Sequence, residues 1–106
     1  MDARKKWIIG SLNYNGTIYI DSGAAKALSI GKSLLAAGIT KIKGNFKKGE
    51  NVIILDQNKI QVARGLSSFS SLEIDKIKGK QSKDIEVILG YLSKTEVIHK
   101  DDMVLF

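Results

Sequence analysis

A Gly-Lys-Ser triplet, Gly31-Lys32-Ser33, is the most suggestive chemical motif in the sequence. Such a triplet ends the phosphate-binding loop, in which backbone N–H groups, a lysine and a hydroxyl hold a nucleotide and its magnesium ion. That loop also needs a glycine five positions earlier, where this chain has Lys26, and a strand before it and a helix after it. The pattern before Gly31 predicts a helix instead. We therefore interpret Gly31 as a helix stop followed by a loop, and we expect no nucleotide site.

The residue types needed for other catalytic classes do not form a recognisable site either. A serine nucleophile elbow requires Gly-x-Ser-x-Gly, and Phe69 stands where the second glycine after Gly65 and Ser67 is needed. His99 is the only histidine and the chain has no cysteine, so zinc clusters, thiol catalysis and disulfides are excluded. We expect no catalytic residue, no metal site and no cofactor in this chain.

The 106-residue chain carries 17 Lys and Arg against 11 Asp and Glu, a formal net charge of +6. Only Arg4 and Arg64 are arginines, and lysine lacks the planar fork that reads phosphates and bases. We therefore favour a solvated, lysine-rich surface over a dedicated nucleic-acid surface. The length corresponds to one domain. With no signal peptide and no apolar run long enough to span a bilayer, we expect a cytoplasmic protein with no membrane partner.

Alternating and apolar segments predict a chain that is mainly β with short helices. Ser22 and Ser82 are the expected N-caps of two helices, and Ser70 with Glu73 has the spacing of a capping box at a third. Gly65 lies inside a predicted strand and indicates a bulge or a close backbone approach. The predicted strands span 17–20, 40–46, 51–55, 60–66, 96–99 and 103–106, and the predicted helices span 23–29, 70–79 and 83–89. We expect these elements to form a compact barrel whose closure hides the strand edges.

The order of these elements and their residues resembles the PUA domain family. The resemblance rests on Ile18 to Ala24, Gly31 to Ile39, Gly44-Asn45-Phe46, Lys48-Gly49-Glu50 and Ala63-Arg64-Gly65. It implies a PUA-like pseudo-barrel over residues 16–106. Residues 1–15, which begin polar and basic, are the expected linker, and Trp7 within them is an expected edge or interface residue. PUA domains are best known as RNA-binding appendages of RNA-modifying enzymes.

The C-terminal part resembles a more specific group, the C-terminal domain of bacterial glutamate 5-kinases. Ile85 to Tyr91 and Val97 to Leu105 carry this resemblance, and Arg4 to Ile8 fits the interdomain linker of that family. It implies a noncatalytic module with an interdomain or regulatory role. Its partner would be an amino-acid-kinase domain of the same polypeptide, absent here, which phosphorylates glutamate with ATP and magnesium in proline synthesis. The full-length enzyme could form an oligomer.

The alternative is a PUA domain that binds RNA through its basic surface. The resemblance to RNA-binding PUA domains points to the first helix and the loop after it, so Lys26, Lys32 and Ser33 are candidate contacts, followed by Arg64 and Lys100. Two lysine clusters, at 41–48 and 76–83, could also follow a phosphate backbone. The third hypothesis, which we favour least, is that the chain is a free-standing enzyme.

Overall fold

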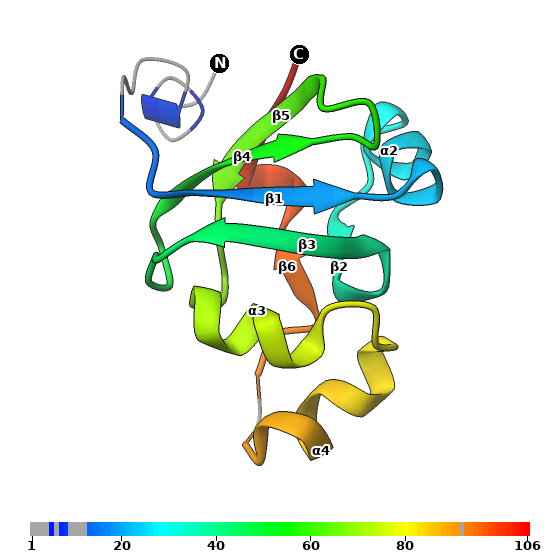
Figure 1. Ribbon diagram of the computed structural model, residues 1–106, viewed down its shortest axis with the longest axis vertical. Coiled ribbons are helices and arrows are strands. Elements are labelled where there is room, and N and C mark those ends of the chain that lie inside the picture. Colours follow the sequence, from blue (N-terminus) through cyan, green and yellow to red (C-terminus); the bar gives the residue numbers. More distant parts are fainter. Residues whose placement is uncertain (1–4, 6, 9–12, 92) are drawn as a thin grey trace.

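A five-stranded sheet forms the centre of the molecule, with the strand order β3-β1-β4-β5-β7 (Figure 1). The computed structural model describes residues 5, 7, 8, 13–91 and 93–106. In the sheet, β1 and β4 are parallel and the other neighbours are antiparallel. A second, two-stranded sheet pairs β2 with β6. Residues 1–4, 6 and 9–12 of the predicted linker lie outside the described residues.

Three α-helices and three short 3-10 turns connect the strands within the described part of the chain. The strands are β1 (Gly16–Ile20), β2 (Leu34–Leu35), β3 (Ile39–Gly44), β4 (Asn51–Leu55), β5 (Gln61–Leu66), β6 (Glu96–Ile98) and β7 (Met103–Leu105). The helices are α2 (Ser22–Ser29), α3 (Ser71–Ile77) and α4 (Ile85–Leu89), and the 3-10 turns are η1 (Ala36–Gly38), η2 (Ser82–Asp84) and η3 (Lys100–Asp102). The expectation of a mainly β chain with short helices is confirmed. No helix among the described residues is long and apolar enough to cross a membrane.

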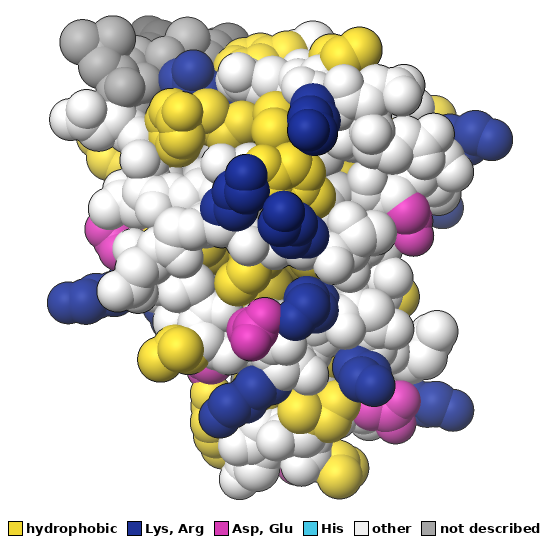
Figure 2. Space-filling model, viewed as in Figure 1, with side chains coloured by type: hydrophobic (Ala, Val, Ile, Leu, Met, Phe, Trp, Pro, Cys, Tyr) yellow, Lys and Arg dark blue, Asp and Glu magenta, His cyan; other side chains and the backbone are white. Residues whose placement is uncertain are grey.

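The outer face of the sheet is polar at β3 and carries lysines. On the face shown in Figure 2, Lys and Arg side chains lie over the sheet around a hydrophobic patch. Tyr19 of β1 pairs with Lys41 of β3, and the ammonium groups of Lys41 and Lys43 lie 5.6 and 5.7 Å from the centre of the Tyr19 ring. At these distances the ring attracts both cations. Lysines on an edge strand also discourage pairing with a second sheet.

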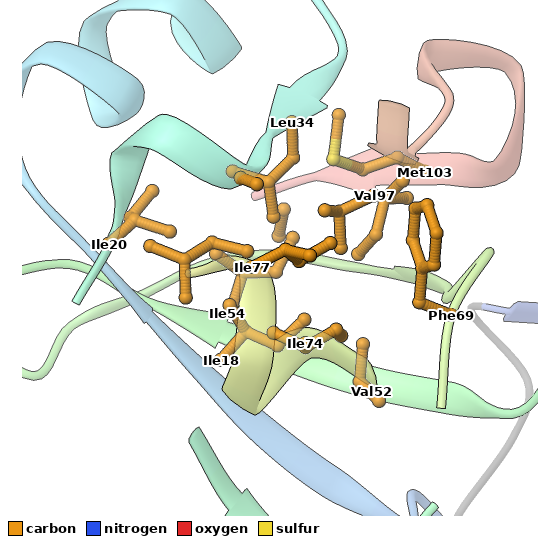
Figure 3. Close-up of a cluster of buried hydrophobic side chains, with 14 of the residues drawn as sticks. Ile18, Ile20, Leu34, Val52, Ile54, Phe69, Ile74, Ile77, Val97 and Met103 are labelled. Carbon is orange, nitrogen blue, oxygen red and sulfur yellow. The ribbon is translucent and has the colours of Figure 1, made fainter. Parts of the chain in front are cut away.

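The inner face of the sheet carries the hydrophobic core (Figure 3). Side chains alternate between the two faces of a strand, so Ile18 and Ile20 of β1 point inward while Tyr19 points outward. Ile74 and Ile77 of α3 pack on this face, both fully buried. From the other side, the core receives side chains of β2, β6 and β7, which are Leu34, Val97, Ile98 and Met103. The apolar run of β4 is buried on both sides, as its composition predicts.

Two of the three predicted helix starts need correction. Ser22 is the first residue of α2 rather than its cap, because Asp21 Oδ1 accepts the N–H of Ala24 at 2.8 Å and Asp21 is the N-cap. Ser82 begins the turn η2, and helix α4 starts only at Ile85 without a side-chain cap. Adjacent Asp and Ser residues are both good caps, so the sequence alone does not decide between them.

The capping box at α3 is confirmed. The Ser70 hydroxyl accepts the N–H of Glu73, and the Glu73 carboxylate accepts the N–H of Ser70. Burial opposes ionisation of Glu73, but hydrogen bonds from Tyr91 and Ser70 outweigh it and hold the pKa of Glu73 below its ordinary value. Tyr91 follows α4, so this carboxylate also joins the end of α4 to the start of α3.

The predicted closure of the barrel is wrong, because the two sheets stay open. In the described residues β3 and β7 are the two edges of the five-stranded sheet, and β2 and β6 pair only with each other. Strand β7 has three residues and β2 has two. The short length of β7 and the lysines of β3 discourage these edge strands from pairing with another chain.

Gly65 is the close approach that the sequence predicts. A Cβ atom at this position of β5 would lie 2.7 Å from Ile98 Cγ2 and 2.8 Å from the backbone oxygen of Asp102. The Asp102 carbonyl is part of η3 and cannot move as a side-chain tip can. Glycine at position 65 therefore lets β6 and η3 pack directly on the sheet.

We predict that Gly65→Ala destabilises the fold by about 2 kcal/mol, because the added methyl group overpacks a contact that includes backbone. Gly23→Ala is the matched control, because a Cβ at Gly23 in α2 would meet Asp21 Oδ1 at an ordinary 3.5 Å. Alanine at that helical position should be neutral or stabilising by up to about 1 kcal/mol. Urea unfolding followed by circular dichroism measures both changes. Equal midpoints for the two variants would contradict this account of Gly65.

Candidate binding surface beside helix α2

A cleft of about 390 Å³ lies between α2, the segment after it and the turn η1. Its walls combine small apolar side chains with three charged ones, Asp21, Lys32 and Glu96. The lining residues are Asp21, Gly23, Ala24, Ala27, Lys32, Ser33, Leu34, Leu35, Ala37, Gly38 and Glu96. They belong to α2, β2, η1 and β6 and to the connections on either side of α2, so the cleft exists only in the folded chain.

Helix α2 is held against the turn η1 by Asp21 and Gly38. The backbone N–H of Asp21 donates to the carbonyl oxygen of Gly38 at 2.9 Å, while the Asp21 carboxylate caps the helix. A Cβ at Gly38 would lie 2.4 Å from the Cβ of Ala24, so glycine is required for this contact. The small residues Ala24 and Ala27 thereby become one wall of the cleft.

The end of α2 directs Lys32 and Ser33 toward the cleft. Gly31 adopts a positive φ of 84°, a conformation that favours glycine. The N–H of Gly31 donates to Leu28 O at 2.9 Å and the N–H of Lys32 to Ala27 O at 3.0 Å. These bonds satisfy carbonyl groups at the helix end and turn the chain back. Gly31 is therefore the helix stop that the sequence predicts, and the residues after it form a cleft wall.

Ser33 joins this loop to the turn η3 near the C-terminal end of the chain. The Ser33 Oγ accepts the backbone N–H of Lys100 at 2.8 Å. The pairing of Leu34 in β2 with Ile98 in β6 holds the same two segments together. Lys100 itself lines a neighbouring depression of about 370 Å³, together with Gly31. The structure thus brings Lys32, Ser33 and the backbone of Lys100 into one region.

Lys26 and Arg64, the two remaining candidate RNA contacts from the sequence, do not line the cleft. Lys26 is exposed in the last turn of α2 and does not line the cleft. Arg64 lies on β5, where its guanidinium carbon is 6.0 Å from the ring centre of Tyr14 and 5.6 Å from that of Phe106. Lys26 shares a helix with the cleft, whereas Arg64 belongs to a different group of side chains.

Two titratable side chains in this region, Asp21 and His99, accept hydrogen bonds from backbone. Asp21 caps α2, and His99 Nδ1 accepts the N–H of Asp101 at 3.1 Å in the turn η3. Among the residues that the structure describes, no group of three or more His, Asp or Glu side chains could hold a metal ion. The cleft wall carries the ammonium group of Lys32 together with the carboxylates of Asp21 and Glu96, so it offers charges of both signs beside apolar side chains.

The sequence does not predict two pairs of residues that lie beside the candidate contacts, one pair at the cleft and one pair at Arg64. Leu35 and Glu96 line the cleft, and they meet through the pairing of β2 with β6 across 61 positions of the chain. Tyr14 and Phe106 flank Arg64 from opposite ends of the sequence. Alternation along single strands gives no information on such pairings. Only the register of the folded sheets brings these side chains together.

Comparison with known proteins identifies relatives of this fold. A family model for the PUA domain matches residues 16–89, which confirms the predicted resemblance. The chain is 62% identical over 104 residues to the glutamate 5-kinase of Pelagibacter ubique (strain HTCC1062). This match covers 98% of the chain and 28% of that relative, so the chain spans less than a third of the enzyme's length.

Solved structures show the same architecture. A PUA domain from Aeropyrum pernix K1, in a tartrate complex, superposes with a TM-score of 0.60 at 23% identity and covers 80% of this chain and 41% of that one. An archaeal box H/ACA sRNP complex contains a chain that superposes with a TM-score of 0.57 at 26% identity. That match covers 79% of this chain and 24% of the other.

We predict that Ser33→Ala releases the turn η3 from the loop after α2. The backbone N–H of Lys100 loses its acceptor, and a hydrogen bond of this kind contributes about 1 kcal/mol. Amide exchange at Lys100 should become about fivefold faster in NMR measurements, because local opening costs less free energy. Ser29→Ala is the control, since Ser29 Oγ donates to the exposed Lys26 O within the same helix. An unchanged exchange rate at Lys100 in Ser33→Ala would contradict this role.

Proposed function

The chain belongs to the PUA domain family, and we propose that it is the noncatalytic PUA module of a glutamate 5-kinase. The observation that carries this proposal is the 62% identity to the Pelagibacter ubique enzyme over 98% of the chain. Because the chain spans 28% of that relative, the proposal assigns the phosphorylation of glutamate with ATP and magnesium to an amino-acid-kinase domain outside this chain.

In this proposal the module acts by packing against the kinase domain and regulating it. The local chemistry supports such a role, because Asp21 and His99 hold backbone in place. Asp21 accepts from the helix start, and His99 Nδ1 accepts the Asp101 N–H. A scaffold fixed by such bonds suits a surface that transmits contacts to another domain.

The test is removal of the segment equivalent to residues 16–106 from an intact glutamate 5-kinase. We expect inhibition by proline to weaken by about tenfold, within the usual range of coupling between two sites. Initial rates of glutamate phosphorylation at several proline concentrations measure this change, and light scattering follows assembly.

Two point variants in the intact enzyme sharpen the same test. Gly65→Ala, which disturbs the packing of β5 on η3, should shift inhibition in the same direction as the deletion. Lys94→Ala changes an exposed side chain after α4 and should leave inhibition unchanged. If the truncated enzyme keeps its rate, its inhibition by proline and its assembly, the proposed role is wrong.

A second candidate function is RNA binding by the surface around α2. The observation that favours it is the grouping of Lys32, Ser33 and the Lys100 backbone beside a cleft, with Lys26 on the adjoining helix. The structural relative within the archaeal box H/ACA sRNP complex supports the same idea at the level of fold. The lysines offer point charges for phosphate groups rather than bidentate recognition of bases.

Titration of the chain with duplex RNA at several salt concentrations tests this second function. Real phosphate contacts make the logarithm of affinity fall with the logarithm of salt concentration. Lys32→Ala and Lys26→Ala should each reduce that slope by about 0.9 if each lysine neutralises one phosphate. Lys94→Ala serves as the control and should leave the slope unchanged. Absence of binding at low salt would rule out this function.

A further inference from the structure

Two side chains of opposite charge line the α2 cleft without an ion partner. Lys32 follows the C-terminal end of α2, and Glu96 belongs to β6. In the part of the chain that the structure describes, neither the Lys32 ammonium group nor the Glu96 carboxylate takes part in a hydrogen bond or an ion pair. The Asp21 carboxylate accepts the N–H of Ala24 with Oδ1 alone, so it adds a further negative charge to the wall. Charges of both signs are thus available to a ligand.

The rest of the cleft wall is mostly small and apolar. Ala24 and Ala27 lie three residues apart on α2, so their methyl groups are on the same side of the helix. Leu35 of β2 is 43% exposed and contributes a larger apolar surface to the same wall. The cleft volume of about 390 Å³ lies within the usual range of small-molecule sites. The cleft therefore has room for a small apolar group beside the charged side chains.

Backbone hydrogen bonds fix the walls of the cleft before any ligand binds. The N–H of Asp21 donates to Gly38 O at 2.9 Å, which holds the start of α2 on η1. The N–H of Lys32 donates to Ala27 O at 3.0 Å, which fixes the loop after the helix. Helix α2 and strand β2 lie side by side (Figure 1). Walls that are already in place reduce the entropy lost on binding.

The two unpaired charges favour a ligand that carries both an anionic and a cationic group. A lysine ammonium group only donates hydrogen bonds, and an ionised carboxylate only accepts them. A ligand with a single charge is attracted by one of these side chains and repelled by the other. A zwitterion satisfies both, and an apolar substituent on it displaces water from Ala24, Ala27 and Leu35. The smallest common molecule with all three features is an α-amino acid with an apolar side chain.

We propose that the α2 cleft binds a free amino acid with a small apolar side chain, whose carboxylate contacts Lys32 and whose ammonium group contacts Glu96. The negative charge of Asp21 on the same wall adds to the attraction for the ammonium group. This inference goes beyond the proposed function and does not depend on it. It can therefore be tested on the 106-residue chain without a kinase domain.

Titration of the ¹⁵N-labelled chain followed by NMR tests the proposal with L-valine and two analogues. Isovalerate lacks the amino group of valine, and isobutylamine lacks its carboxylate. We expect L-valine to shift the backbone amides of the cleft with a dissociation constant of about 1 mM. Each analogue should bind about tenfold more weakly, because it leaves one charged side chain without its partner. Glycine keeps both charges without the apolar group, and it should also bind about tenfold more weakly.

Two variants assign the charges to the side chains. Glu96→Gln should weaken L-valine about tenfold and leave isovalerate unchanged, because isovalerate has no ammonium group. Lys32→Met should weaken L-valine about tenfold and leave isobutylamine unchanged, because isobutylamine has no carboxylate. Lys26→Met is the matched control, since Lys26 is exposed on α2 and does not line the cleft. It should bind L-valine as the unmodified chain does.

Other outcomes overturn the proposal. If L-valine gives no saturable shifts at the cleft, the cleft is not a site for such amino acids. Equal binding of L-valine, isovalerate and isobutylamine means that the apolar walls alone hold the ligand. An equal loss in Lys26→Met and Lys32→Met means that the net charge of the chain is responsible. Shifts at the cleft with RNA and none with L-valine identify a nucleic-acid surface instead.

Discussion

Parallel pairing between β1 and β4 at the centre of the sheet determines how the rest of the chain is arranged. Parallel neighbours cannot be joined by a tight hairpin, so the chain must return from the end of β1 to the start of β4 through a long connection. Residues 21–50 form that connection and contain α2, β2, η1 and β3. Because Ile18 and Ile54 lie in register and are fully buried, sliding one strand against the other would expose the core face.

The connection also creates the cleft. Helix α2 rests on η1 through the contact of Gly38 with Ala24, and the chain after its glycine stop places Lys32 and Ser33 in the cleft wall. The outer face of the sheet has a different character, with Tyr19 between two lysines at β3 and Arg64 between two rings at β5. The molecule therefore presents two surfaces with different chemistry. The α2 cleft offers charges of both signs beside apolar walls, and β5 carries Arg64 close to the rings of Tyr14 and Phe106.

Sequence alone predicts those features whose causes are local. Alternation along β1 and the apolar run of β4 indicate strands, and the Ser70 and Glu73 pair marks the start of α3. The sequence predicts Ser22 as the N-cap of α2 where the structure has Asp21, because Asp and Ser have similar capping ability. The open sheets and the meeting of Leu35 with Glu96 depend on pairings between distant segments, and hydrophobic periodicity carries no information on those. The resemblance to PUA domains predicts that Lys32 and Ser33 belong to one surface. It does not predict that Phe106 lies beside Arg64.

The late position of β6 and β7 has a consequence for biosynthesis. β2 has its strand partner in β6 and one side of β5 is covered by β7, so residues 96–105 complete both sheets. The Ser33 hydrogen bond to Lys100 joins positions 67 residues apart. During synthesis, the segments of β1 to β5 are made before their partners β6 and β7. The apolar side chains of Leu34 and Ala63 therefore lack part of their core packing until residues 96–105 are added. Neither sheet can therefore be completed before residues 96–105 have been synthesised.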